Sequence, residues 1–271
     1  MSRVQQSRGQ GVVLALGLAF LYAPIAWIVF FSFGGDPAAG AGGGLSLHWY
    51  RALFENQDLM DAARRSLVLA LLSSPLATLI GASAGIALAR LERFPGRSLL
   101  IALLAVPIFA PEVLLGFAFL MLFATLESLT GWPQGKGLLT LVIAHATLGA
   151  SIVASVVFAR VADVDRSLES AARDLGARPL RVLLTVTLPL AAPGIVSGWL
   201  LALTLSFDDV VTSSFLAGPE NTTLPMAVFS SVRVGLNPQI NAIGTLMLVG
   251  IAAIVGITFG AIRLGKRPGS A

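Results

Sequence analysis

Residues 169–177 read Glu-Ser-Ala-Ala-Arg-Asp-Leu-Gly-Ala, and Leu188-Pro189 follows shortly afterwards. This stretch is a short, charged, helix-prone island in a chain that is otherwise almost entirely apolar. A membrane protein has little reason to keep a long polar segment between two spans unless something outside the bilayer holds it. The stretch therefore indicates membrane spans on either side of a polar segment to which a partner binds.

The composition excludes an ordinary soluble domain. Hydrophobic residues make up 56% of the 271 positions and charged residues 12%, whereas soluble domains carry about 25% charged residues. The chain contains no cysteine, which excludes disulfides, thiolate metal ligands and a cysteine nucleophile. We expect no metal site. We also expect no nucleic-acid binding, because the distribution of the basic residues explains the net charge of +4.

Six apolar stretches are long enough to cross a bilayer core, which takes about 20 helical residues. The first is too long for the apolar part of a signal peptide and lacks a small-residue cleavage site, so we expect it to be an uncleaved span. We predict an all-helical integral membrane protein whose single transmembrane domain covers residues 1–271, with its core at about 62–262. The predicted spans lie near residues 11–33, 67–89, 98–124, 138–159, 189–213 and 240–262.

The basic residues predict the orientation of these spans. With the N-terminus inside, the cytoplasmic segments hold thirteen Lys and Arg residues and the outer segments hold five. Basic residues favour the cytoplasmic side, so both termini and the loop at about 160–188 are predicted to be cytoplasmic. The inner set is Arg3, Arg8, Arg90, Arg93, Arg97, Arg160, Arg166, Arg173, Arg178, Arg181, Arg263, Lys266 and Arg267. The outer set is Arg51, Arg64, Arg65, Lys136 and Arg233.

The predicted outer loop at 34–66 has a flexible part and an amphipathic part. Glycine and alanine fill residues 38–44, as in a flexible linker. The sequence continues as Leu-His-Trp-Tyr at 47–50, and aromatic rings favour the membrane–water boundary. We interpret this segment as an interfacial helix, with a contact to a receptor as the alternative.

The 160–188 loop predicts two short helices joined by a glycine turn. Asp163 and Asp165 precede the alanine pair, and acids favour the start of a helix. Gly176 allows a turn that a Cβ would obstruct. Pro179 begins a second piece, and Pro189 stands where the chain is expected to enter the fifth span. The two alanines leave room for a partner to approach closely.

This loop resembles the signature of the inner-membrane permease subunits of binding-protein-dependent ABC importers. That signature is a Glu-Ala-Ala run, then glycine, with Ile-x-Leu-Pro ten residues later; here Gly176 is followed at that distance by Val-Thr-Leu-Pro at 186–189. Ser170 stands where the signature has glutamate, and Glu169, one residue upstream, is the expected substitute. The resemblance implies the type I importer permease fold and these ATPase-coupling residues: Glu169, Ala171, Ala172, Asp174, Gly176, Leu188 and Pro189.

A further resemblance is to the polyamine branch of these permeases, and within it to the putrescine permeases. The matching residues are Ser206–Val211, Gly218-Pro219, Thr223–Pro225, Phe229–Arg233, Gly131–Pro133, Leu139-Thr140 and Ala144-His145. The resemblance implies ATP-driven import of polyamines, putrescine more than spermidine, across the bacterial inner membrane. It implies as partners a homologous permease subunit, two ATP-binding subunits that hold ATP and Mg²⁺, a periplasmic solute-binding protein, and membrane lipid. No catalytic residue and no cofactor are expected in this chain.

Three acids are the predicted pathway residues. Glu112 lies within an apolar span, and Asp208 and Asp209 lie toward the outer end of another. An acid in mid-membrane costs about 2.5–3.5 kcal/mol on insertion scales, so it usually faces a pathway or a partner. Because adjacent residues point about 100° apart on a helix, one aspartate is free to cap a helix or meet water. We predict a pathway role for at least one acid, with Glu112 and Asp208 preferred.

Two patterns suggest chemistry that the context excludes. Gly-Ala-Ser-Ala-Gly at 81–85 matches a serine-nucleophile pattern, but that pattern needs a strand-to-helix elbow. Small residues four apart in a membrane helix instead favour close packing, and His145 is expected to be a hydrogen-bonded residue of the bundle. Residues 131–137 lack the P-loop spacing, so another subunit must hydrolyse ATP.

Three alternatives remain open. The first keeps the ABC architecture but changes the cargo to another small solute, such as an amino-acid derivative, an opine or thiamine. The second is an ATP-independent secondary transporter or channel, which has no reason to keep the 160–188 loop in this form. The third, a membrane enzyme, lacks a nucleophile or metal cluster in the sequence.

Overall fold

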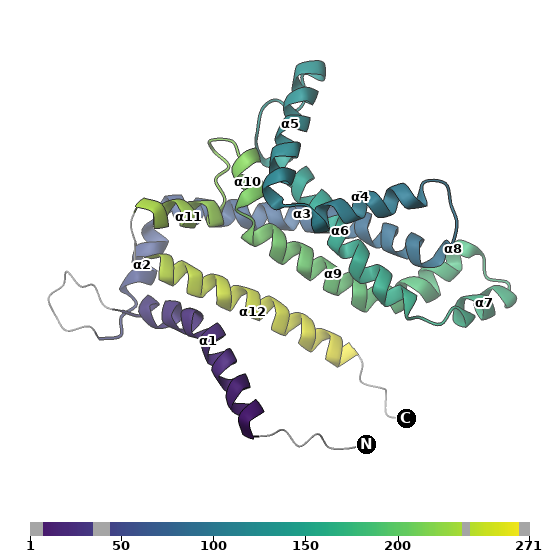
Figure 1. Ribbon diagram of the computed structural model, residues 1–271, viewed down its shortest axis with the longest axis horizontal. Coiled ribbons are helices and arrows are strands. Elements are labelled where there is room, and N and C mark those ends of the chain that lie inside the picture. The colour runs from purple at the N-terminus through teal and green to yellow at the C-terminus, as the bar shows by residue number, and fades with distance from the viewer. Residues whose placement is uncertain (1–7, 35–43, 235–238, 266–271) are drawn as a thin grey trace. The chain divides into compact units, whose positions relative to one another are not determined.

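The computed structural model describes residues 8–34, 44–234 and 239–265. Every regular element within these residues is helical (Figure 1), which confirms the predicted all-helical class. Most of the predicted linker at 38–44 lies outside the described residues, as do three basic residues used to predict the orientation: Arg3, Lys266 and Arg267.

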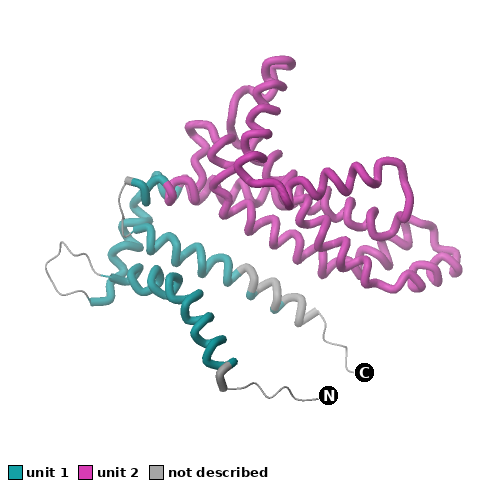
Figure 2. The backbone as a smooth tube through the Cα atoms, in the orientation of Figure 1, with its two compact units in different colours: residues 1–60, 230–260 teal, residues 61–229, 261–271 magenta. Residues whose placement is uncertain are grey.

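The chain divides into two compact units, which Figure 2 colours separately. Unit 1 comprises residues 1–60 and 230–260, and unit 2 comprises residues 61–229 and 261–271. The single transmembrane domain expected over residues 1–271 stays a prediction.

Unit 1 contains α1 (Arg8–Ser32), α2 (His48–Glu55) and most of α12 (Gln239–Gly265). The hydroxyl of Ser32, at the end of α1, lies 2.8 Å from the hydroxyl of Tyr50 on α2. The side chain of Leu53 is fully buried, whereas Phe54 is exposed, so α2 is amphipathic. The helix expected at residues 47–50 is therefore confirmed as the start of α2.

Unit 2 contains the other helices, although α3 begins and α11 ends in unit 1. They are α3 (Gln57–Arg90), α4 (Arg97–Phe109), α5 (Glu112–Thr130), α6 (Leu138–Ala162), α7 (Ser167–Asp174), α8 (Pro179–Val182), the π-helical segment η2 (Leu183–Thr187), α9 (Leu188–Asp208), α10 (Val211–Leu216) and α11 (Leu224–Val234).

Most of the predicted spans correspond to long apolar helices. The spans expected near 11–33, 67–89 and 138–159 lie in α1, α3 and α6, and the one near 240–262 lies in α12. Among the described residues, five helical segments are long and apolar enough to cross a membrane: Gln10–Ser32, Gln57–Arg90, Glu112–Thr130, Leu138–Ala162 and Pro179–Asp208.

The prediction of one continuous helix over residues 98–124 is wrong. Between α4 and α5, Ala110 and Pro111 have extended backbone, with ψ of 144° and 134°. Proline has no N–H to donate and disfavours helix at the preceding residue, so the chain leaves the helix here. In Figure 1, α5 points away from the direction of α4.

The span expected at 189–213 begins earlier and ends sooner than predicted. Residues 179–208 form one continuous helical run, with no break at Pro189. The π-helical segment carries the helix to the proline, with the Leu188 N–H bonded to the Leu183 carbonyl. The run ends at Asp208, because Asp209 is extended, with ψ of 123°.

Helix α6 is the centre of unit 2, and its neighbours reach it through small side chains. A Cβ at Gly81 of α3 would lie 2.5 Å from the Ala150 carbonyl oxygen and 2.6 Å from the Val153 Cβ. On α6 itself, a Cβ at Gly149 would lie 2.9 Å from the Ala77 Cβ of α3. The contacts at Gly81 confirm that the Gly-Ala-Ser-Ala-Gly pattern at 81–85 serves close helix packing.

We expect Gly81→Leu to separate α3 from α6 and destabilise unit 2, because overpacking costs about 1–3 kcal/mol and sometimes more. The matched control is Ser83→Leu, which adds similar bulk to an exposed position of the same helix. The measurement is the thermal unfolding midpoint of the purified protein in detergent. Equal midpoints for the two variants would contradict the packing role of Gly81.

Candidate functional site

The break before Pro111 decides where Glu112 lies. Glu112 is the first residue of α5, so it stands at the start of an apolar helix and not in the middle of one. The α5 helix is held there by α10: a Cβ at Gly116 would lie 2.6 Å from the Phe215 ring. The approach through Gly116 therefore positions the start of α5 beside the end of α9.

Asp209 occupies the corresponding break between α9 and α10. Its carboxylate accepts hydrogen bonds from the backbone N–H groups of Thr212 (3.2 Å) and Ser213 (2.7 Å). These are donors of the first turn of α10, which a helix leaves without internal partners. Asp209 therefore caps α10, and its orientation is set by two backbone hydrogen bonds.

His145 of α6 connects this break to the rest of the bundle. Its Nδ1 lies 2.8 Å from the Ser206 hydroxyl and its Nε2 lies 3.2 Å from the Ser213 hydroxyl. The same Nε2 is 3.5 Å from the Asp209 carboxylate, and Ser206 also pairs with Ser73 of α3 at 2.9 Å. The expectation of a hydrogen-bonded bundle histidine is confirmed.

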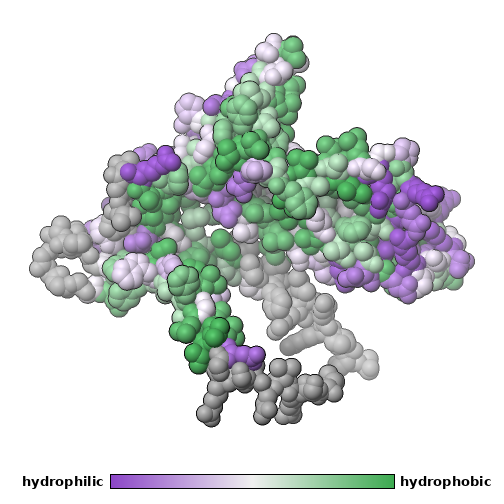
Figure 3. Space-filling model, in the orientation of Figure 1, coloured by the Kyte–Doolittle hydropathy of each residue, from purple (hydrophilic) through white to green (hydrophobic). Residues whose placement is uncertain are grey.

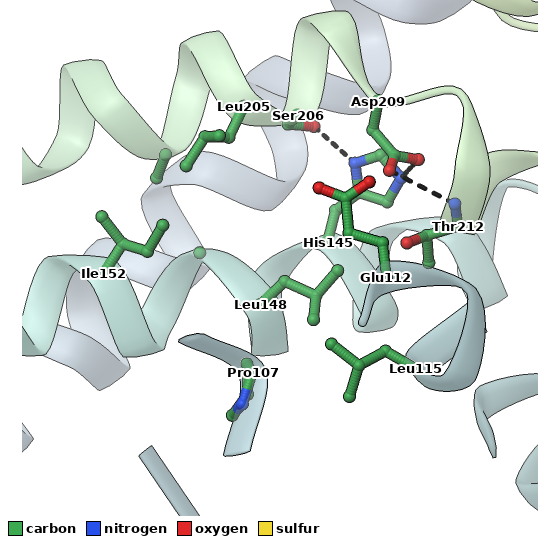
Figure 4. Close-up of a pocket in the computed structure, with 12 residues that line it drawn as sticks. Pro107, Glu112, Leu115, His145, Leu148, Ile152, Leu205, Ser206, Asp209 and Thr212 are labelled. Atoms are coloured by element: carbon green, nitrogen blue, oxygen red, sulfur yellow. Dashed lines mark hydrogen bonds and ion pairs between the residues drawn. The ribbon is translucent and has the colours of Figure 1, made fainter. Parts of the chain in front are cut away.

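Glu112 and Asp209 line the same cavity (Figure 4). The cavity has a volume of about 100 Å³. In Figure 4 the Glu112 carboxylate points to the same side as Asp209 and His145, while the other walls are mainly apolar. Carboxylate oxygens in apolar surroundings can replace the water around a cation. The apolar lining side chains are Pro107, Leu115, Leu148, Ile152, Ala202 and Leu205.

The geometry favours Asp209 over Asp208 as the second cavity acid. Asp208 is the last residue of α9 and is exposed, and it lies outside the set of described residues that line the cavity. Sequence reasoning also did not predict that Ser73, Ser206 and Ser213 belong to the hydrogen-bond network around His145. Serines at helix positions facing a histidine are a signal for such a network, but only the fold shows that they meet.

No group of three or more His, Asp and Glu side chains within the described ranges has the geometry of a metal site.

The polar loop forms the second candidate site. Asp165 begins it, accepting hydrogen bonds from the Ser167 hydroxyl (2.6 Å) and backbone N–H (2.9 Å). These hydrogen bonds, that from the hydroxyl first, lower the pKa of Asp165. The Asp165 carboxylate thus marks the start of α7, as expected, whereas the same expectation for Asp163 is wrong, because Asp163 is the C-cap of α6.

The predicted glycine turn follows the end of α7, at Gly176. Its φ is +85°, a left-handed conformation that favours glycine. The Ala177 N–H bonds to the Ala172 carbonyl at 3.1 Å, and the Gly176 N–H bonds to the Arg173 carbonyl at 2.8 Å. This pair of bonds is a Schellman motif. A Cβ at Gly176 would have no atom within 4 Å, so the turn lies open to a partner.

The coupling residues expected on α7 separate onto two faces. Ala171, Asp174 and Gly176 are exposed and Ala172 is half-buried, whereas Glu169 is buried and pairs with Arg90 at 2.7 Å. Leu188 and Pro189 lie beyond η2 in α9. Figure 3 shows hydrophilic residues gathered at the end of unit 2 that holds α7.

Leu175 is an exposed apolar residue within this polar surface, and sequence reasoning did not single it out. Its side chain is 90% exposed, next to the Gly176 turn. An exposed leucine beside an open turn is a position where a partner can bury apolar surface.

Asp209 has a structural role that can be separated from its charge. Asp209→Asn keeps one of the two acceptor oxygens at the start of α10, so it should cost less stability than the loss of both. Asp209→Ala removes the cap, which costs about 0.5–2 kcal/mol. Thermal unfolding of the purified protein should place the Asn variant between wild type and Ala; an Asn variant as unstable as Ala would contradict the capping role.

A family model described as "Binding-protein-dependent transport system inner membrane component" matches residues 77–267. The putrescine transport system permease protein PotI of Escherichia coli K12 is 44% identical over 245 residues, covering 90% of this chain and 87% of that protein. The spermidine/putrescine transport system permease protein PotC of Haemophilus influenzae is 38% identical, covering 88% of this chain and 90% of that protein.

Solved structures show the same fold. A chain of a bacterial ABC transporter that imports the acidic polysaccharide alginate has a TM-score of 0.67 at 16% identity, covering 98% of this chain and 100% of that chain. A chain of the MetNI methionine ABC transporter has a TM-score of 0.63 at 18% identity, covering 77% of this chain and 96% of that chain. The predicted importer permease fold is therefore confirmed. This chain is a multi-pass membrane protein that belongs to the binding-protein-dependent transport system inner membrane components, the permease subunits of ABC importers.

Proposed function

We propose that this chain is the permease subunit of an ATP-driven importer that carries polyamines, putrescine more than spermidine, across the bacterial inner membrane. The observation that supports it most directly is the cavity in which Glu112 and Asp209 lie together among apolar side chains. The relatives named for putrescine and spermidine transport give the cargo class.

The cavity suits an organic ammonium group. A polyamine carries positive charge along an apolar carbon chain, and the cavity offers carboxylates within apolar walls. Because α10 and His145 hold the Asp209 carboxylate, the site loses little entropy when a cation binds. The small volume, about 100 Å³, fits one ammonium end and not a whole polyamine.

The remaining parts of the transporter follow from the loop and the charge distribution. The basic residues favour cytoplasmic termini and a cytoplasmic 160–188 loop. Two ATP-binding subunits, which hold ATP and Mg²⁺, would dock on the exposed face of α7 and the Gly176 turn. A homologous permease subunit would complete the pathway within the lipid bilayer, and a periplasmic solute-binding protein would deliver the cargo from outside.

The two cavity acids give the first functional prediction. Glu112→Gln and Asp209→Asn should each raise the KM for putrescine uptake by about tenfold or more, because a charged hydrogen bond contributes about 1.5–3 kcal/mol and 1.4 kcal/mol is tenfold. The measurement is uptake of labelled putrescine and spermidine by the complete reconstituted complex, with and without ATP.

Glu127→Gln is the matched control, because this exposed acid accepts a bond from the Gly135 N–H that glutamine preserves. A larger effect from Asp208→Asn than from Asp209→Asn would make Asp208 the pathway acid, as the sequence suggested. ATP-dependent uptake of a different solute would keep the importer and discard the polyamine cargo. Uptake indifferent to ATP would contradict the importer itself.

The open turn gives the second prediction. Gly176→Trp should sharply lower the amount of solute carried per ATP hydrolysed, because the indole would fill the space that the docking subunit needs. Gly96→Trp is the control, since Gly96 has a similar φ of +84° and open surroundings but lies outside the docking loop. Normal transport per ATP in the Gly176 variant would refute docking at this turn.

A further inference from the structure

Helix α7 is attached to the bundle through a charged residue. All eight residues of α7 are described, and Glu169 is the one that is buried. An isolated helix of this length is not stable in water, and α7 has no buried apolar side chain to hold it. The contacts of Glu169 therefore hold α7 from its buried face, in addition to Arg166 just before the helix, which donates to the Ala89 carbonyl at 2.9 Å.

Glu169 meets two elements besides its own. Its Oε1 accepts a hydrogen bond from Nε of Arg90, the last residue of α3, at 2.7 Å. The same oxygen accepts one from the hydroxyl of Thr187, the last residue of η2, at 2.8 Å. The Arg90 and Glu169 side chains are 11% and 9% exposed, so water screens this pair little.

Arg90 and Glu169 make further contacts at the start and in the last turn of α7. Arg90 also donates to the Val164 carbonyl at 3.3 Å, just before α7. Arg173 lies 4.0 Å from the other Glu169 oxygen. The Thr187 hydroxyl reaches Glu169 from a π-helical segment, and such segments are frequent at functional sites.

We propose that Glu169 is a positioning residue that links the partner-facing helix α7 to α3 and to the η2–α9 helix, so that a push on α7 moves these elements together. Its carboxylate acts inside this chain and not on the ATPase. The exposed face of α7, including Ser170 in place of the signature glutamate, is left for docking. The inference rests on the proposed docking of ATPase subunits to this loop.

A displacement of α7 would be passed along α9 to the cavity. Helix α9 runs from η2 to Asp208, immediately before Asp209, and carries the cavity residue Ser206. A displacement of α7 that is passed to η2 is therefore passed along a continuous helix toward the cation site. Without the Glu169 contacts, the start of α7 is still bonded to the end of α3 through Arg166, but α7 loses its hydrogen bond to Thr187 of η2, so α7 can shift relative to α9.

The test measures attachment and coupling separately. Because the chain has no cysteine, spin labels on Leu168→Cys of α7 and Leu91→Cys after α3 report one distance distribution in a complex whose other subunits are cysteine-free. Both leucines are exposed. Solute uptake per ATP hydrolysed is measured on the unlabelled complex in proteoliposomes, with labelled putrescine and the solute-binding protein present.

Glu169→Gln is expected to broaden the distance distribution and to lower uptake per ATP about tenfold, within the range usual for coupling between sites, while ATP hydrolysis continues. The double variant Arg90→Glu with Glu169→Arg restores the opposite charges and should recover both readouts in part. The matched control is Glu92→Gln, which breaks the exposed pair of Glu92 with Arg166 (2.8 Å) and should change neither readout.

A narrow distribution and unchanged uptake per ATP in Glu169→Gln would overturn the proposal, as would equal effects from Glu92→Gln. Where a charge variant does not assemble, Thr187→Val, which removes the hydroxyl and keeps the shape, must broaden the distribution; an unchanged distribution in that variant also overturns it. If the wild-type complex carries no polyamine, the proposed cargo fails, but the distance distributions still decide the role of Glu169.

Discussion

The close approach of helices to α6 is the constraint on which the rest of unit 2 depends. Gly81 and Gly85 of α3 have no room for a Cβ against α6, and a Cβ at Gly198 of α9 would lie 3.1 Å from Val153 of α6. Apolar side chains gain little by leaving lipid for another helix, so helices in a membrane associate through packing and hydrogen bonds. Small residues permit both, because they let backbones and short polar side chains meet.

The polar network around His145 follows from that packing. The imidazole reaches hydroxyls of α9 and α10 directly, and α3 joins through the pair of Ser73 with Ser206. Hydroxyls are short, so these bonds form only where the backbones are close. The network in turn orients Asp209, and the two helix breaks, after Phe109 and after Asp208, bring Glu112 into the same cavity.

Glu169, which is buried near the start of α9, is also held by hydrogen bonds. Unpaired charges in low-dielectric surroundings are unfavourable, and Glu169 is satisfied by Arg90 and Thr187. Asp209 is instead tied to backbone N–H groups and has part of its carboxylate facing a cavity. The surroundings of the two acids thus differ: Glu169 is engaged by side chains within the protein, whereas Asp209 also lines a cavity.

The sequence by itself determined the helical class, most of the spans and the turn at Gly176. Each depends on local properties: apolar length, the start-of-helix preference of Asp165, and the left-handed conformation that glycine permits. The loop signature was also sufficient to predict the permease family. Pro111 favours a break in the third span, because proline disfavours helix at the preceding residue, but the direction of α5 after the break depends on the tertiary structure.

Only the tertiary structure decided which acids act together. Glu112 and Asp209 are far apart in sequence and share a cavity because two helices end beside each other. Asp208 and Asp209 look equivalent as neighbours, yet one ends a helix and the other caps the next. Likewise, the sequence predicts a contact between Glu169 and a partner, whereas the structure places its carboxylate against Arg90 and Thr187. Pairings of this kind depend on how separate helices pack, and neither composition nor periodicity carries that information.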